Sequence, residues 1–214
     1  VVAIMHFTKY LSFLTLACLA VLTFYTTPSM ACSCMPAHPQ TSYCNADYVV
    51  VVRVLRKSTR LVKHQAAYKV EIKKSYKMTP EGHKTLRHGR VLTPLEDSMC
   101  GVNLILGKLY VIAGRGSQLS LCNYVKEYQK MSIIERKGFS GVYRKACACE
   151  VKTCFGNSCL VHSETDTGCK WSPMAKCETE FSACMPSTYR TPEGPIRQCR
   201  WRRTPLYDEC MSNP

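Results

Sequence analysis

Cysteine is the residue type whose number and spacing could do the most chemistry in this 214-residue chain. There are fifteen cysteines, and all but Cys18 follow Ala31. Closely spaced cysteines either bind zinc as thiolates or pair as disulfides, and the redox state of the compartment decides between them. The two closely spaced groups are Cys32-x-Cys34 and Cys147-x-Cys149-x4-Cys154-x4-Cys159.

The first thirty-one residues have the pattern of a secretory signal peptide. Lys9 precedes an apolar run over residues 10–25, and the small residues Ser29 and Ala31 form a small-x-small cleavage pattern. The apolar run is shorter than a typical membrane-spanning helix, so a retained membrane anchor is the weaker alternative. Cleavage after Ala31 would leave 183 of the 214 residues, beginning at Cys32.

Export favours oxidised cysteines, and the count agrees with that. Removing residues 1–31 also removes Cys18, which leaves fourteen cysteines, an even number that predicts seven disulfides. A structural zinc site is the competing interpretation, but Cys147-x-Cys149 has the wrong spacing for a zinc knuckle. We therefore expect a secreted protein of the extracellular space and matrix, with no membrane span and no metal cofactor of its own.

The chain has a strong positive charge, which indicates an attraction to polyanions. The formal charge of +14 falls to +13 without residues 1–31, which contain Lys9 and no acidic residue. Such a surface attracts polyanions, and outside the cell these are heparin and other sulfated glycosaminoglycans. No nucleic-acid-binding motif is present, so we expect no nucleic-acid partner; a basic surface that only confers solubility is the alternative. The candidate residues are Arg53, Arg56, Lys57, Arg60 and Lys63, around a short connection over residues 55–65, and Arg200, Arg202 and Arg203.

Most of the elements that position these residues are expected to be strands. The run 48–55 is rich in valine, and residues 68–73 alternate between apolar and charged. Glycines separate three further apolar segments at hairpin-like spacing: 102–106, 109–113 and 119–122. Segment 128–136 predicts one helix that ends at Gly138. Five or six short strands with one or more packed helices predict a mainly β, OB-like barrel.

The composition changes from Cys149 onward, where cysteines, prolines and charges replace the alternating pattern. This predicts a second, smaller domain in which disulfides substitute for a large core. The expected organisation is a signal peptide over 1–31, an N-terminal domain over 32–147 and a disulfide-rich C-terminal domain over 148–214.

The sequence resembles the tissue inhibitors of metalloproteinases over essentially the whole mature chain. The segments that carry the resemblance are Cys32-Ser33-Cys34-Met35-Pro36-Ala37-His38-Pro39-Gln40, Cys44-Asn45-Ala46-Asp47, Met99-Cys100-Gly101-Val102, Val111-Ile112-Ala113-Gly114, Leu121-Cys122-Asn123, the Cys147 to Cys159 group and Cys199-Arg200-Trp201. The resemblance implies a netrin-type OB-like domain, a small disulfide-rich domain and a monomer that inhibits extracellular zinc metalloproteinases. It agrees with the absence of HExxH and G-x-S-x-G motifs, which argues against an enzyme.

The resemblance also implies the disulfide pairs, which spacing alone cannot give. The implied pairs are Cys32–Cys100, Cys34–Cys122, Cys44–Cys147, Cys149–Cys199, Cys154–Cys159 and Cys169–Cys184. Cys177 and Cys210 remain, and the simplest inference is that they pair with each other. An intermolecular bond is the alternative.

By the same resemblance, the site is a protease-binding ridge. The implied ridge residues are Cys32, Ser33, Cys34, Met35 and Pro36, with Ser98, Met99 and Cys100 beside them. The free α-amine and the carbonyl oxygen of Cys32 would chelate the zinc of the target protease, and Ser33 would enter its specificity pocket. Because Ser33 is small, we expect broad inhibition. Two alternatives remain: Cys32 and Cys34 only anchor the chain end, or the protein is a non-inhibitory netrin-like module that binds matrix or heparin.

Overall fold

The computed structural model describes residues 14–16, 32–60, 64–159, 167–192 and 194–213. The chain divides into two compact units, Val1–Ala31 and Cys32–Pro214. Residues 14–16 are helical, and the rest of the expected signal peptide and its cleavage pattern lie outside the described residues. Within the described part of the chain, no helix has the length and apolar character needed to cross a membrane.

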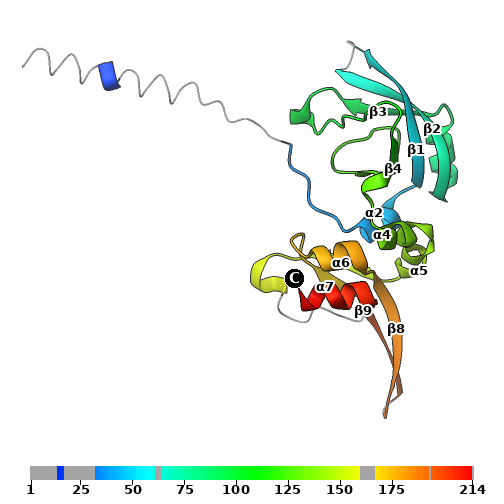
Figure 1. Ribbon diagram of the computed structural model, residues 1–214, viewed down its shortest axis with the longest axis vertical. Coiled ribbons are helices and arrows are strands. Elements are labelled where there is room, and N and C mark those ends of the chain that lie inside the picture. Colours follow the sequence, from blue (N-terminus) through cyan, green and yellow to red (C-terminus); the bar gives the residue numbers. More distant parts are fainter. Residues whose placement is uncertain (1–13, 17–31, 61–63, 160–166, 193, 214) are drawn as a thin grey trace, which may run out of the picture. The chain divides into compact units, whose positions relative to one another are not determined.

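One five-stranded antiparallel sheet dominates the second unit, which confirms the mainly β prediction (Figure 1). The strand order is β3-β2-β1-β4-β5. The strands are β1 (Tyr48–Arg60), β2 (Gln65–Met78), β3 (Arg90–Pro94), β4 (Leu109–Gly114) and β5 (Tyr124–Glu127).

The valine run of β1 is buried on both faces of the sheet. Val50 and Val52 belong to one core with Ile112 of β4, whereas Val49 and Val51 belong to a second core on the opposite face. Successive side chains of a strand point to opposite faces, so a strand covered on both faces is a continuous apolar run. This explains why the segment lacks the alternation of β2.

Helices and short helical turns accompany the sheet, and several of them supply the second core. They are α2 (Pro39–Asn45), α3 (Pro80–Leu86), the 3₁₀ turns η1 (Asp97–Met99) and η2 (Tyr128–Lys130), α4 (Ile133–Lys137), the π turn η3 (Gly138–Val142) and α5 (Tyr143–Ala146). The prediction of a helix over 128–136 was right in place but wrong in span. Met131 is extended, and α4 begins only after Ser132, whose hydroxyl accepts the Glu135 N–H at 3.0 Å.

The predicted connection over residues 55–65 is wrong. β1 continues through Arg60 and β2 begins at Gln65, with pairing from Arg56 opposite Lys69 to Arg60 opposite Gln65. Arg53, Arg56 and Lys57 therefore lie on a strand rather than in a loop. Lys63 lies outside the described residues.

Two of the predicted strands, 102–106 and 119–122, are wrong. Over residues 102–106 the backbone is irregular, because side chains and not a neighbouring strand accept three of its N–H groups. The acceptors are the hydroxyls of Thr93, Tyr68 and Tyr110, bonded to the N–H groups of Val102, Leu104 and Ile105. Residues 119–122 contain one buried leucine followed by a turn, and the fifth strand is β5 instead.

The C-terminal part is small and rich in disulfides, as predicted. Its elements are β6 (Glu150–Thr153), the 3₁₀ turn η4 (Gly156–Cys159), β7 (Gly168–Trp171), α6 (Lys176–Phe181), β8 (Cys184–Thr191), β9 (Gly194–Trp201) and α7 (Pro205–Ser212). Strands β6 and β7 are parallel, and β8 and β9 form an antiparallel hairpin. The core here consists of cysteines, Trp171, Trp201, Tyr207 and Val151. Cross-links and indole rings thus take the place of a large aliphatic core.

Candidate functional site

Two adjacent disulfides hold the segment that follows Ala31. Cys32 is bonded to Cys100, and Cys34 is bonded to Cys122. The four sulfur atoms all lie within 4.8 Å of one another. Four sulfurs at this spacing could bind a metal as thiolates, but here each is already in a disulfide and no thiolate is left. The cluster is therefore a covalent anchor.

The anchored segment turns its cysteines inward and its other side chains outward. Cys32 and Cys34 are half-buried, whereas Ser33, Met35 and Pro36 are exposed, Met35 to 75%. This alternation leaves the side chain of Ser33 free to contact another molecule.

A second segment is fixed beside the first through Cys100. The N–H groups of Met99 and Gly101 both donate to the carbonyl of Glu96 at 3.1 Å, and this closes a tight turn over η1. Cys100 has a φ of +60°, and a Cβ on Gly101 would lie 2.5 Å from the Pro94 carbonyl oxygen, so only glycine fits there. Ser98 and Met99 are exposed, Met99 to 45%. The Cys32–Cys100 disulfide thus joins the two segments, 32–36 and 98–100, to which the resemblance assigned the ridge.

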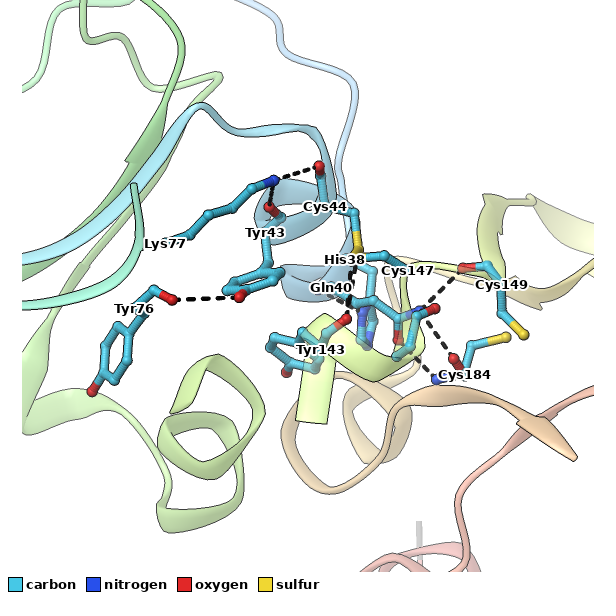
Figure 2. Close-up of a disulfide and its surroundings, with 11 residues drawn as sticks. His38, Gln40, Tyr43, Cys44, Tyr76, Lys77, Tyr143, Cys147, Cys149 and Cys184 are labelled. Atoms are coloured by element: carbon cyan, nitrogen blue, oxygen red, sulfur yellow. Dashed lines mark hydrogen bonds between the residues drawn. A yellow bond between two sulfur atoms is a disulfide. The ribbon is translucent and has the colours of Figure 1, made fainter. Parts of the chain in front are cut away.

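Helix α2 follows the ridge directly and is held by two buried polar side chains (Figure 2). Gln40 is almost fully buried, and the two hydrogens of its amide nitrogen are shared among the carbonyls of Ala146, Cys149 and Cys184 at 3.0, 3.2 and 3.0 Å. Its amide oxygen accepts the N–H of Cys184 at 2.9 Å. One side chain therefore ties the start of α2 to the end of α5, to the residue before β6 and to the start of β8.

His38 is the second buried polar residue at this place. Its Nδ1 accepts the N–H of Gln40 at 3.1 Å, which caps α2, and its Nε2 bonds the Glu178 carbonyl of α6 at 3.1 Å. Burial lowers the pKa of His38 from 6.5 to about 4, although the hydrogen bond to Glu178 opposes this. We call His38, Gln40 and their hydrogen-bond partners the α2 joint.

Sequence reasoning assigned no role to His38 and Gln40. The only local signal is Pro39, because proline favours the first position of a helix and so makes His38 the cap. Apart from the Gln40 N–H that His38 accepts, the partners of both side chains lie more than a hundred residues away, and no local pattern reveals them.

The other disulfides fix the remaining elements around the ridge and the joint. They are Cys44–Cys147, Cys149–Cys199, Cys154–Cys159, Cys169–Cys184 and Cys177–Cys210. The last one joins α6 to α7, and with it the structure contains the six pairs that the resemblance implies and the pair inferred for Cys177 and Cys210.

Comparison with known proteins agrees with this geometry. The family model described as tissue inhibitor of metalloproteinase matches residues 30–201. A Drosophila melanogaster protein named tissue inhibitor of metalloproteinase is 54% identical over 98% of this chain and 100% of its own length. Proteins named metalloproteinase inhibitor 3 from Xenopus laevis and Gallus gallus are each 30% identical, over 69% and 67% of this chain and 70% and 69% of their own lengths. The chain therefore belongs to the tissue inhibitor of metalloproteinase family, whose members are named as inhibitors of metalloproteinases and not as enzymes.

Proposed function

We propose that the mature chain is secreted and inhibits zinc metalloproteinases of the extracellular space by binding the catalytic zinc of the protease through Cys32. After cleavage behind Ala31, the α-amine and the carbonyl oxygen of Cys32 form a five-membered chelate. A catalytic zinc held by three protein ligands keeps one position for water, which this chelate can displace. The amine has an ordinary pKa of about 8, so binding must release a proton, which the zinc charge favours.

The observation that carries the proposal is the paired anchoring of Cys32 and Cys34 with Ser33 exposed between them. A free chain end would lose conformational entropy on entering a cleft, whereas this one is ordered before binding. The second segment, Ser98 and Met99, is fixed to the same disulfide and would extend the contact to the other side of the zinc. The exposed methionines offer adaptable apolar contacts.

We expect the mature protein to inhibit at least one matrix metalloproteinase with one inhibitor per active site and without being cleaved. The ridge offers metal ligands where a substrate would offer a scissile peptide bond. Titration of an active-site-calibrated protease, followed by mass measurement of the inhibitor, tests this. Residual protease activity at a clear molar excess, or a cut within the ridge, would contradict the proposal.

A second candidate function, binding of a sulfated polysaccharide such as heparin, is supported by a row of basic residues across three strands. Lys69 of β2 lies opposite Arg56 of β1 and opposite Arg90 of β3, and all three side chains are exposed. Like charges directly opposite each other destabilise a sheet, and among the described residues no ion pair neutralises these three. Arg87 and His88 extend the row and, with Lys69, Gly89 and Arg90, line a surface hollow of about 460 Å³. A linear polyanion would offset the repulsion along this row.

This candidate is tested by heparin binding at increasing salt. We expect the double variant Lys69→Gln, Arg90→Gln to bind more weakly and with a shallower salt dependence, because two charges of the row are removed. The matched control is Lys145→Gln, Lys176→Gln, which removes two exposed charges from α5 and α6. Equal losses in both variants would show a diffuse charge effect and contradict a site on the row.

A further inference from the structure

The groups around the His38 ring determine its protonation state. Its side chain is fully buried, with ring centroids of Trp171 and Trp201 at 5.5 and 5.3 Å and that of Tyr143 at 6.3 Å. The Glu178 carbonyl can only accept, so Nε2 carries the hydrogen, and the Gln40 N–H can only donate, so Nδ1 carries none. Both hydrogen bonds therefore require the neutral Nε2–H tautomer.

A second proton on Nδ1 would point at the N–H group of Gln40 and place a charge in a dry site. The groups that face the ring do not compensate that charge. From α6 only the carbonyl of Glu178 reaches the ring, while the carboxylate of Glu178 lies 3.4 Å from the Tyr207 hydroxyl. From α5 the facing group is the phenol of Tyr143, and from β7 and β9 it is an indole. Helix α2 itself has no charged residue.

We propose that His38 is an acid-sensitive latch: protonation of its ring opens the α2 joint and releases the start of α2 from the C-terminal part of the molecule. The latch opens on acidification because only the open state exposes Nδ1 to water. The ridge ends at Pro36, two residues before the latch, and the hydroxyl of Thr153 donates to the Pro36 carbonyl at 3.3 Å. Opening therefore loosens the C-terminal part from the segment that carries the ridge and leaves the Thr153–Pro36 hydrogen bond without the support of the α2 joint.

The size of the effect follows from proton linkage. In the open state the histidine has its ordinary pKa of 6.5, and in the closed state burial lowers the pKa to about 4. The open state thus binds more protons between these values, so the closed state is favoured most above pH 6.5 and loses stability as the pH falls towards 4. Between pH 7 and pH 5 the equilibrium constant for opening should rise about 20-fold to 30-fold.

Hydrogen exchange of the mature, disulfide-intact protein tests the latch, with rates corrected for the intrinsic effect of pH. We expect the protection of residues 38–45 and 178–184 to fall about 20-fold between pH 7 and pH 5, while that of β1 and β4 stays unchanged. The matched variant is His38→Asn, because asparagine can cap α2 and donate a hydrogen bond but does not titrate. Its protection should be independent of pH over this range.

Two outcomes would overturn the proposal: pH-independent protection in the wild-type protein, or the same pH dependence in His38→Asn. If the variant does not fold, the ring resonance of His38 in the wild-type protein decides the question by NMR. A titration midpoint well below 6 supports the latch, and a midpoint at or above 6.5 excludes it. Neither measurement involves a protease, so the latch can fail while the proposed inhibition stands.

Discussion

One alanine added before Cys32 is expected to weaken protease inhibition by two to three orders of magnitude. The extra residue converts the α-amine of Cys32 into an amide, which is a poor zinc donor, and places bulk where the metal would lie. A loss of about 3 to 4 kcal/mol of binding free energy corresponds to this factor, since every 1.4 kcal/mol is tenfold in affinity. The measurement is the inhibition constant of the extended and the mature protein against the same matrix metalloproteinase.

The disulfides and the sheet should not respond to this change. Cys32 remains bonded to Cys100, and the extension precedes every element of the second unit, so the thermal midpoint should stay within about one degree. The matched control carries one additional alanine after Pro214 and should inhibit like the unmodified protein. If the protein extended before Cys32 inhibits as tightly as the mature one, chelation is wrong, and the protease must bind the five-stranded sheet or the C-terminal part.

Replacing Gln40 with leucine is expected to lower the free energy of unfolding by about 4 kcal/mol. Leucine has a similar size but makes none of the four hydrogen bonds of the Gln40 amide to Ala146, Cys149 and Cys184. Each buried polar group left without a partner costs about 1 to 3 kcal/mol. Denaturant unfolding under non-reducing conditions measures the loss.

The matched control for this variant is Gln129→Leu in η2, where the side chain is exposed. We expect a change of less than about 0.5 kcal/mol there, because surface substitutions away from special features have small effects. If the two variants lose similar stability, the hydrogen bonds of Gln40 do not hold the α2 joint as described.

Local sequence patterns were sufficient to predict the strands that are covered by apolar residues. The valine run of β1 and the alternation of β2 were recognised in the sequence. A strand buried on both faces is a continuous apolar run, and a strand buried on one face alternates between apolar and polar residues. The same patterns missed residues 56–60 of β1, which are exposed and polar where they are described. That half of the strand exists because β2 pairs with it, and a partner strand is not visible in local composition.

The segment 102–106 shows the opposite error, a predicted strand that is absent from the structure. It was predicted to be a strand because it is apolar and bounded by glycines, yet it is not one, because the hydroxyls of Thr93, Tyr68 and Tyr110 accept three of its backbone N–H groups. Periodicity reports which side chains are buried, and it does not report which groups accept the backbone hydrogen bonds.

The sequence by itself determined the closely spaced cysteines behind a small-x-small pattern, an even cysteine count after Ala31 and a strongly basic chain. The ridge residues and the disulfides that anchor them were implied by the family resemblance, whose segments are short and contiguous in the chain. Only the tertiary structure decided that His38 and Gln40 are buried and that Arg56, Lys69 and Arg90 form one row. Burial and strand register depend on contacts between residues far apart in sequence, and those contacts form only when the chain folds.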